Sequence, residues 1–497
     1  MARPQDSSSD TAPTGRPKAV VIMAAGLGTR MRSATIKVLH PVAGRPMIHY
    51  PVQSALELGA ERVVVVLGHQ RDRVEAALRA AFPEAPIEVA IQAEQLGTAH
   101  AVLCARAALA DFDGDVFILS GDVPTLPTAT IAALDAATGE AAVGVLGMRL
   151  DDPAAYGRLV EEDGRLVRIT EYRDASAAVR AIDRVNVGVY RVDARFLFDT
   201  LGRLGSDNAQ GEYYLTDIVA AAAEQDRGTA CLVLDGEAAA EACGVNDRVD
   251  LAAAEQRMQR RLRAHLMREG VTLVDPDRVT LHAGVEVGPD TVIEPGVALL
   301  GQTVIGPGCH IEQGCRISDS RIEHGTRVLG QSHIDRSRIG SGCQVGPFAR
   351  LRVGTVLHDK VKVGNFVETK KAVFEAGAKA SHLSYLGDAR VGPKANIGAG
   401  TITCNYDGVN KHRTDIGAGA FIGSDTQLVA PVTVGAGAFV GAGSTITQDV
   451  PADALALSRS RQANVEGWAE RRRARLAAEA AAKAAEKATE QADGRKD

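Results

Sequence analysis

The amino-acid sequence predicts an α/β, Rossmann-like first domain followed by a parallel β-helix. In residues 18–246, short runs rich in Val and Ile alternate with helix-like segments. From residue 271 onward, apolar residues instead recur at every sixth position. The chain also contains 51 glycines but only 4% aromatic residues, a composition that suits tight turns and small side chains. Together these observations predict a change of architecture near residue 270.

The first domain is expected to contain a mostly parallel sheet that is covered on both faces. Its strand-like runs lie at residues 19–25, 63–67, 87–91, 116–119 and 141–146. Helix-like stretches such as residues 47–58 and 73–81 separate most of them. Continuous apolar strands joined by helical crossovers are typical of parallel sheets. In such sheets, ligands bind beyond the carboxyl ends of the strands.

The six-residue period predicts a hexapeptide β-helix over residues 271–462. No helix has this period, and an ordinary amphipathic strand alternates every two residues. Neighbouring glycines such as Gly288, Gly306, Gly364 and Gly417 are expected in turns that need positive φ. The period is kept by three runs: Val287, Ile293, Leu299, Ile305, Ile311, Ile317; Ile339, Val345, Leu351, Leu357, Val363; and Ile416, Ile422, Leu428, Val434, Val440, Ile446.

Four other segments complete the predicted organisation. Residues 247–270 are charged and Ala-rich and are expected to form a helix that links the two domains. Residues 404–413 interrupt the hexapeptide period and predict a projecting loop of the kind that often carries binding residues. Residues 1–17, rich in Ser, Thr, Pro and Asp, predict a flexible tail. Residues 463–497, rich in Ala, Glu, Lys and Arg, predict a solvated tail that is at most helical.

Composition argues against several classes of function. The net charge of −6 argues against a nucleic-acid partner, which usually needs a basic surface. The seven cysteines include no CxxC pair, and we interpret them as reduced thiols of a cytoplasmic protein. No apolar run is long enough to insert across a membrane.

A phosphate-binding site is predicted where the first strand ends. The strand leads into the glycine-rich turn Met23–Met31, whose backbone N–H groups can approach phosphate oxygens. Arg30 in this turn and the following Lys37 can offset charge on a transferring phosphoryl group. Asp122 follows the run at 116–119, where a carboxylate suits Mg²⁺. The alternative readings are a structural turn with solvated cations and a turn-capping aspartate.

These motifs resemble sugar-1-phosphate nucleotidylyltransferases. The matching segments are Thr29–Met31, Lys37, Gln92–Thr98 and Gly121–Asp122. Joined to a hexapeptide β-helix, they resemble the bacterial bifunctional family that combines N-acetylglucosamine-1-phosphate uridylyltransferase with glucosamine-1-phosphate N-acetyltransferase. The resemblance runs from about residue 19 to residue 468. It implies an α/β Rossmann-like nucleotidyltransferase domain followed by a left-handed parallel β-helix.

The resemblance also implies substrates, partners and roles. The substrates are UTP, N-acetylglucosamine-1-phosphate, glucosamine-1-phosphate and acetyl-CoA, the metal is Mg²⁺, and the enzyme is a cytoplasmic homotrimer that supplies peptidoglycan synthesis. In the first domain, Lys37 and Arg30 act on the phosphates, and Asp122 and Asn246 bind the metal. The remaining implied substrate-binding residues are Met23, Ala24, Ala25, Gly26, Gln92, Gly97, Thr98, Ser120, Gly121, Gly157, Glu171 and Asn186.

A second constellation lies in the predicted β-helix. Acylation of an amine needs a base, and histidine is the side chain best matched to that role at neutral pH. A lone histidine in a β-helix is more often packed or at the surface, but the neighbours of His382 match the acetyltransferase half of the family. The resemblance makes His382 the base and Glu368 its orienting residue. It assigns the sugar phosphate and the sugar to Arg352, Lys370, Tyr385 and Asn396, and acetyl-CoA to Ala399, Asn405, Tyr406, Ser424, Ala442 and Arg459.

Two other functions are considered. One is a nucleotidylyltransferase for a different sugar, with the β-helix serving in regulation or assembly. The other is a trimeric scaffold that binds a nucleotide as a signal without catalysis. The set of His382, Asn396 and Asn405–Tyr406 argues against the first, because a purely structural β-helix would not need it. The second predicts loss of Lys37, Asp122 or His382, and all three are present.

Overall fold

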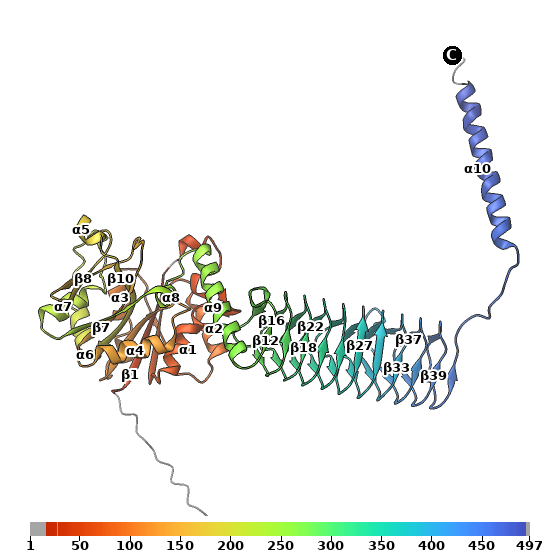
Figure 1. Cartoon of the computed structure of the whole chain (residues 1–497), viewed down its shortest axis with the longest axis horizontal. Helices are drawn as coiled ribbons and strands as arrows, with labels where there is room; N and C mark the ends of the chain where they lie inside the picture. Colours follow the sequence, from red (N-terminus) through yellow and green to blue (C-terminus); the bar gives the residue numbers. More distant parts are fainter. Residues whose placement is uncertain (1–15, 27, 494–497) are drawn as a thin grey trace, which may run out of the picture. The chain divides into compact units, whose positions relative to one another are not determined.

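The computed structural model describes residues 16–26 and 28–493. Most of the predicted N-terminal tail, Leu27 in the glycine-rich turn, and the last four residues of the predicted C-terminal tail lie outside the described residues. The chain divides into two compact units, residues 1–354 and residues 355–497. Each unit is described by itself, with elements labelled as in Figure 1.

A twisted mixed sheet forms the centre of the first unit. Its strands lie in the order β11-β7-β10-β6-β1-β4-β5, with β8 and β9 forming a hairpin beside β10. Neighbours are parallel except around β10, which runs antiparallel to both β6 and β7. The strands are β1 (Lys18–Ala24), β4 (Arg62–Leu67), β5 (Ile87–Ile91), β6 (Asp115–Ser120), β7 (Val143–Arg149), β8 (Arg158–Glu162), β9 (Arg165–Thr170), β10 (Arg184–Asp193) and β11 (Thr229–Leu234).

Helices cover both faces of this sheet, as the apolar strands predicted (Figure 1). One buried cluster packs the sheet against α1 (His49–Glu57), α2 (Arg71–Ala81) and α4 (Thr128–Thr138). The cluster on the other face includes α3 (Thr98–Leu103), α6 (Ala194–Leu201) and α7 (Asp217–Glu224). Every strand-like run read from the sequence corresponds to a strand of this sheet.

The first unit also contains the first coils of a β-helix. Helix α8 (Gly236–Glu241) leads to α9 (Arg248–Arg268), whose N-cap is Asp247. Short strands then run from β12 (Thr272–Leu273) to β25 (Arg350–Leu351), and every third strand belongs to the same parallel sheet. The side chain of Gln259 on α9 donates to Leu281 O at 2.6 Å and accepts from Leu281 N at 2.9 Å. Because the first coils pack on α9 in this way, they form one compact unit with the α/β domain.

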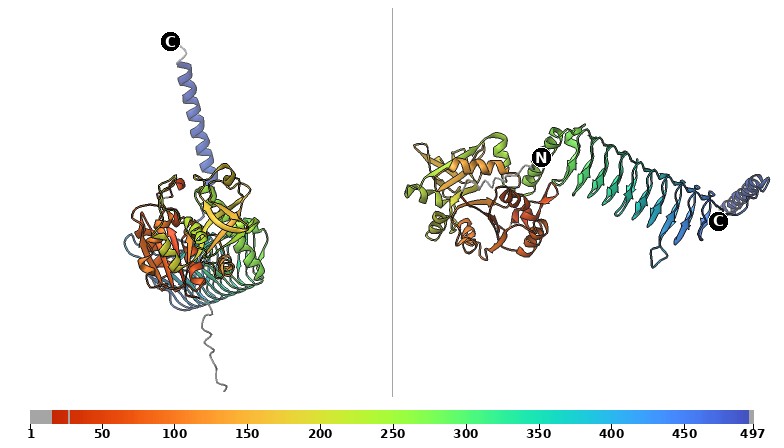
Figure 2. Two further views of the ribbon diagram at one scale, coloured as in Figure 1. Left: turned by 90° about the vertical axis from the view of Figure 1, so that its left-hand side faces the viewer. Right: turned by 90° about the horizontal axis from the view of Figure 1, so that it is seen from below.

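The second unit continues the same three-sided pattern from β26 (Val356–Leu357) to β41 (Leu455–Ala456). Residues one coil apart pair in parallel register, such as Ile397 with Ile422 and Ile422 with Val440. Of the residues that define the six-residue period, all but the half-buried Val287 are buried. The architecture is the predicted left-handed parallel β-helix, whose coils Figure 2 shows edge-on.

The expectation that glycines at the coil corners adopt positive φ is wrong for all four positions named above, Gly288, Gly306, Gly364 and Gly417, whose φ values are not positive. A Cβ at Gly417 would lie 2.4 Å from Ala436 N in the next coil, and one at Gly288 would lie 2.6 Å from Pro307 N. These glycines are therefore required because neighbouring coils approach each other closely there, not because the turn needs a left-handed residue.

The two irregular segments of the second unit follow the sequence pattern. Residues 405–413 leave the coil as a loop that projects from the β-helix in the right-hand view of Figure 2. Asp407 organises this loop by accepting from the N–H groups of Val409 and Asn410 and from the ring of His412. The Ala-rich segment near the C-terminus forms the helix α10 (Trp468–Asp493), which is exposed over residues 468–488, because Ala, Glu, Lys and Arg favour helix even without packing.

Candidate active sites

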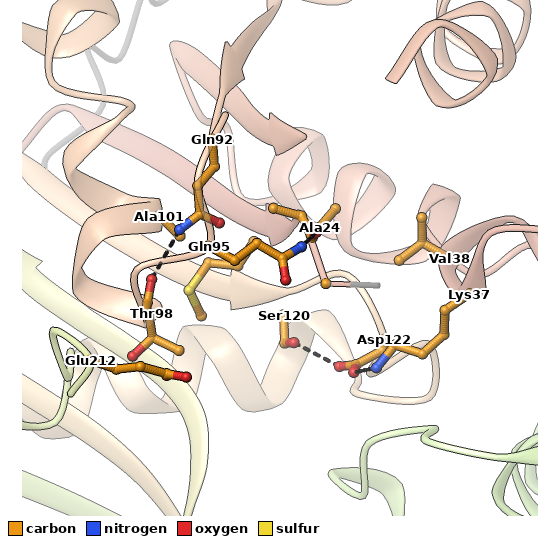
Figure 3. A pocket seen from close by; sticks show the side chains of 14 residues that line it. Ala24, Lys37, Val38, Gln92, Gln95, Thr98, Ala101, Ser120, Asp122 and Glu212 are labelled. Atoms are coloured by element: carbon orange, nitrogen blue, oxygen red, sulfur yellow. Dashed lines mark hydrogen bonds and ion pairs between the residues drawn. The ribbon is translucent and has the colours of Figure 1, made fainter. Parts of the chain in front are cut away.

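A cavity of about 320 Å³ opens at the carboxyl edge of the central sheet (Figure 3). It brings together segments that are far apart in the sequence. The turn after β1, the turn that begins at Lys37, the segment after β5 and the end of β6 all contribute. The predicted residues that line it are Met23, Ala24, Ala25, Gly26, Lys37, Gln92, Gly97, Thr98, Ser120 and Asp122.

Lys37 and Asp122 form an ion pair at one side of this cavity. The other carboxylate oxygen of Asp122 accepts from the hydroxyl of Ser120 at 2.6 Å. Because β1 and β6 are parallel neighbours, with Met23 opposite Ser120, the segments that follow them lie side by side. A Cβ at Gly28 would lie 2.6 Å from the Cβ of Lys37, so a larger residue there would displace the lysine.

Asn246 and Arg30 lie beside this ion pair. The backbone N–H of Val245 donates to Asp122 O at 2.9 Å, which places the next residue, Asn246, near the carboxylate. Arg30 Nη2 donates to Asn246 Oδ1 at 2.8 Å. Both predicted metal ligands therefore contact a cation. Asp122 forms an ion pair with Lys37, and Asn246 accepts a hydrogen bond from Arg30.

Gln92 and Thr98 lie on the opposite side of the cavity in Figure 3, and Gly97 also lines it. The amide of the buried Gln92 donates to Gly97 O at 3.1 Å, which folds the segment 92–98 into a closed loop. The Thr98 hydroxyl accepts from Leu215 N at 3.0 Å. Gly97 has φ of +111°, and a Cβ there would lie 2.5 Å from Tyr213 O, so only glycine fits between these segments.

The structure adds two polar residues that the sequence analysis did not select. Gln95 lines the cavity, and its side chain donates to Ala25 O at 2.7 Å. Glu212 reaches the cavity from the loop before α7. The position of Gln95 inside the matched segment 92–98 was an available signal. No spacing in the sequence indicates Glu212, because it reaches the cavity only when α3 packs beside the loop at residues 211–215.

Gly157, Glu171 and Asn186 come together near the β8–β9 hairpin. Asn186 N donates to Gly157 O at 2.9 Å, and a Cβ at Gly157 would lie 3.5 Å from both Glu171 carboxylate oxygens. Asn186 lies where the register of β10 shifts against β7, a bulge that redirects its side chain. Burial raises the pKa of Glu171, although the Thr216 hydroxyl donates to the carboxylate. The three residues thus form a small polar cluster on the same domain as the cavity.

In the second unit, His382 ends β30 (Lys379–His382) and lies opposite Asn365, the last residue of β27 (Lys362–Asn365). His382 Nδ1 is 2.7 Å from Asn365 Oδ1. Because an amide oxygen only accepts, Nδ1 carries the proton in the neutral ring, and Nε2 keeps its lone pair. Asn365 is therefore a further residue of this site, one whose role the sequence analysis did not assign.

The other predicted acetyl-transfer residues lie on neighbouring strands. Glu368 and Lys370 are on β28 (Glu368–Lys370), which pairs with β31 (Tyr385–Gly387) so that Glu368 lies opposite Tyr385. Asn396 begins β33 (Asn396–Ile397), opposite the first residue of β30. Arg352 follows β25 in the first unit.

The residues assigned to acetyl-CoA form a row along successive coils. Asp425 N donates to Ala399 O at 2.7 Å, Gly443 N donates to Ser424 O at 2.8 Å, and Arg459 Nη1 donates to Ala442 O at 2.7 Å. Small side chains along the row end at the Arg459 guanidinium, a suitable partner for a phosphate. Asn405 is buried and donates to Asp388 Oδ2 at 2.6 Å, and Tyr406 is exposed at the base of the projecting loop.

The fold and sites define a two-domain transferase, with a nucleotide-sized cavity in an α/β domain and a hexapeptide β-helix that carries a separate polar site. Comparisons with known proteins agree with this class. Residues 20–186 match the MobA-like NTP transferase domain, residues 276–381 the GMPPB C-terminal domain, and residues 413–448 the bacterial transferase hexapeptide family.

Curated relatives cover nearly the whole chain. A bifunctional protein GlmU of Pelobacter propionicus is 51% identical over 453 residues, which are 90% of this chain and 97% of the relative. Those of Geobacter sulfurreducens and Anaeromyxobacter dehalogenans are 48% and 51% identical, and the alignments cover 92% and 93% of this chain and 99% and 94% of the relatives. The chain belongs to the GlmU family of bifunctional uridylyltransferases and acetyltransferases, which confirms the predicted resemblance.

Within residues 16–26 and 28–493, no helix is long and apolar enough to cross a membrane.

The half-buried carboxylate of Glu171 leads to a prediction about stability. The pKa of Glu171 is raised in the folded state, which means that folding disfavours the charged carboxylate. The charged carboxylate therefore destabilises the fold, and this effect is fully present at pH values above the folded-state pKa. Glu171→Gln should therefore raise the thermal unfolding temperature at pH 8, and the gain should shrink as the pH falls toward the ordinary glutamate range. Glu224→Gln, at an exposed position on α7, is the control. If Glu171→Gln raised the unfolding temperature equally at pH 8 and in the ordinary glutamate range, the burial argument would be contradicted.

Proposed function

We propose that this protein makes UDP-N-acetylglucosamine in two steps at two separate sites. The β-helix transfers acetyl from acetyl-CoA to glucosamine-1-phosphate, and the α/β domain then transfers UMP from UTP to the product. The single observation that best supports this is that one chain combines the Lys37–Asp122 cavity with the His382–Asn365 pair. The nucleotide-sugar product would supply peptidoglycan synthesis, and both reactions belong in the cytoplasm, where UTP and acetyl-CoA are made.

In the first domain, the proposed reaction is an in-line displacement. An oxygen of the sugar 1-phosphate attacks the α-phosphorus of UTP, the bond to the bridging oxygen breaks, and pyrophosphate leaves. Lys37 and Arg30 offset the charge on the phosphates, and the backbone of residues 23–26 approaches them closely. Gln92, Gly97 and Thr98 recognise uracil, and the cluster of Gly157, Glu171 and Asn186 binds the sugar.

The donor set of this domain fits Mg²⁺. Asp122 and Asn246 offer oxygen atoms, which Mg²⁺ prefers, and these atoms accept from the cationic groups of Lys37 and Arg30. The two cations thus place positive charge beside the oxygen atoms that would bind the metal ion. Among the described residues, no group of three or more His, Cys, Asp or Glu could hold a metal by itself. One carboxylate and one amide are nevertheless sufficient, because Mg²⁺ keeps waters and binds substrate phosphates. When bound, Mg²⁺ would neutralise phosphate charge.

In the β-helix, the amine of glucosamine-1-phosphate attacks the thioester carbonyl, and the thiol of CoA leaves. His382 Nε2 takes the proton from the amine, and Asn365 fixes the ring so that this nitrogen is the acceptor. Tyr385 and Asn396 contact the sugar, and Lys370 holds its phosphate. The roles of Glu368 as an orienting residue and of Arg352 as a phosphate ligand rest on the family resemblance alone. Acetyl-CoA lies along the row from Ala399 to Arg459 and against the Asn405–Tyr406 loop.

We also propose a homotrimer, as the family resemblance implies. Phe421, Phe439 and Leu455 lie in register on one face of the β-helix and are 40%, 47% and 64% exposed. The two phenyl rings stack with centroids 4.5 Å apart. A continuous exposed apolar ladder on a regular surface is typical of a protein interface. Further copies of the chain are the expected partners for this face.

Asp122→Ala should lower pyrophosphate release from UTP by at least about 100-fold, because it removes both the partner of Lys37 and a metal ligand. Thiol release from acetyl-CoA should stay within about twofold. EDTA should have the same selective effect on the wild-type chain. Asp199→Ala, at an exposed position on α6, is the matched control. Normal pyrophosphate release in the variant or in EDTA would refute the metal assignment.

His382→Ala should lower acetyl transfer by about 10²–10⁴-fold, the usual contribution of a positioned base. Asn365→Ala should cause a smaller loss, since the ring remains but its orientation is no longer fixed. Both activities are measured on each variant, with free thiol for acetyl transfer and pyrophosphate for uridylyl transfer to pre-acetylated sugar. The second activity should be unchanged. Near-normal acetyl transfer by His382→Ala would show that another group is the base.

Phe439→Lys should dissociate the trimer, because it places a charge in the centre of the apolar ladder. Sedimentation equilibrium should show the mass of three chains for the wild type and a lower mass for the variant. Val249→Lys, at a position that is 77% exposed on α9, should not change the mass. A wild-type monomer, or a Phe439→Lys trimer as stable as the wild type, would contradict this interface.

A further inference from the structure

The segment that follows Lys37 folds back as a small hairpin. Strands β2 (Pro41–Val42) and β3 (Arg45–Pro46) pair in antiparallel register. The base of this hairpin is bonded to the turn that begins at Lys37, with Met47 N donating to His40 O and Ile48 N donating to Val38 O, both at 3.0 Å. These bonds tie the hairpin to the turn that contains Lys37.

The tip of the hairpin rests on the first coil of the β-helix. Ala283 N donates to Ala43 O at 2.9 Å. Gly44 has φ of +77°, and a Cβ there would lie 2.2 Å from His282 Nδ1. The imidazole cannot readily turn away, because the same nitrogen accepts from Gly301 N at 2.9 Å in the next coil. Gly44 is thus needed because the hairpin passes directly over a fixed ring.

Helix α9 holds the hairpin from a second side. Glu255 Oε2 accepts from Ala43 N at 2.6 Å, and Glu255 Oε1 accepts from the Gln259 amide at 2.8 Å. Gln259 in turn is bonded to both backbone groups of Leu281 in the first coil. Around these contacts, a buried apolar cluster joins the hairpin to α9 and to the segment before it, formed by Val42, Ala43, Met47, Val245, Ala254 and Met258.

We propose that His282 and Ala283 of the β-helix, together with Glu255 of α9, are positioning residues for uridylyl transfer. They hold the hairpin, and the hairpin holds the backbone of Lys37 at the distance from which its ammonium reaches Asp122. A lysine side chain is flexible, so its charge is placed accurately only when its backbone is fixed. The first coil of the acetyltransferase domain is thereby part of the uridylyltransferase machinery. This inference rests on the proposed function of the cavity.

The test uses full-length Gly44→Ala. The added methyl must push the hairpin away from His282, which shifts Lys37 relative to the phosphates. A displacement of about 1 Å at a catalytic group can cost about 100-fold. We expect kcat for uridylyl transfer to fall by about tenfold or more, with KM for UTP within about twofold and acetyl transfer unchanged. Glu255→Ala, which removes a hydrogen bond without adding a clash, should show the same selective loss in kcat.

Two further variants separate positioning from general damage. Gly59→Ala is the matched control, because Gly59 has φ of +73° but no atom within 4 Å of an added Cβ. It should keep normal kcat. His282→Ala alone should lower kcat, because the hairpin loses its support. Adding Gly44→Ala to His282→Ala should then change kcat by less than about threefold, because the ring that the methyl would meet is gone.

The proposal is overturned if Gly59→Ala loses as much kcat as Gly44→Ala, if both reactions fall in proportion, or if Gly44→Ala costs as much kcat in the His282→Ala background as in the wild type. A wild-type chain without uridylyl transfer would instead overturn the proposed function, which this comparison distinguishes.

Discussion

The ion pair between Lys37 and Asp122 is the interaction on which the arrangement of the first domain depends. The two residues are distant in sequence and meet only because β1 and β6 are parallel neighbours whose carboxyl ends share one edge. Three neighbouring segments position this ion pair. Gly28 leaves room for the lysine, Ser120 holds the carboxylate, and the backbone of Val245 brings Asn246 beside it. Charge is thus concentrated where phosphates would bind, and the part of the chain that the structure describes holds no larger group of acidic ligands there.

The β-helix satisfies a different constraint, the close stacking of its coils. Each coil contributes inward-facing aliphatic side chains to a narrow core, and at corner glycines such as Gly288 and Gly417 the backbones approach so closely that a Cβ would collide with the next coil. This rigid stack places residues one coil apart in exact register, as with Asn365 and His382. The same rigidity makes its first coil a firm support for the hairpin that follows Lys37. Helix α9 also contacts that hairpin and the first coil. The two domains are therefore held together by the same helix, although their reactions take place at separate sites.

Much of this structure could be predicted from the sequence, and the failures have physical causes. The six-residue period identified the core residues, because that period follows directly from the coil geometry. The central strands were equally visible as apolar runs, but the antiparallel β10 inside the sheet was not, since strand order depends on tertiary packing. Glu212 was missed because a loop brings it to the cavity. Asn365 was missed as the partner of His382, because these residues are separated by 17 positions rather than by a multiple of six. The corner glycines were recognised, but the reason for them lies in the neighbouring coil.

The central claim is that two reactions occur in a fixed order at two sites of one chain. The most direct measurement supplies the purified full-length protein with glucosamine-1-phosphate, UTP and Mg²⁺, and follows pyrophosphate and free thiol separately before and after acetyl-CoA is added. The account predicts little pyrophosphate before the addition, then thiol release, then pyrophosphate release that lags behind it. Pyrophosphate released at full rate without acetyl-CoA, or thiol release that leads to no pyrophosphate, would contradict it.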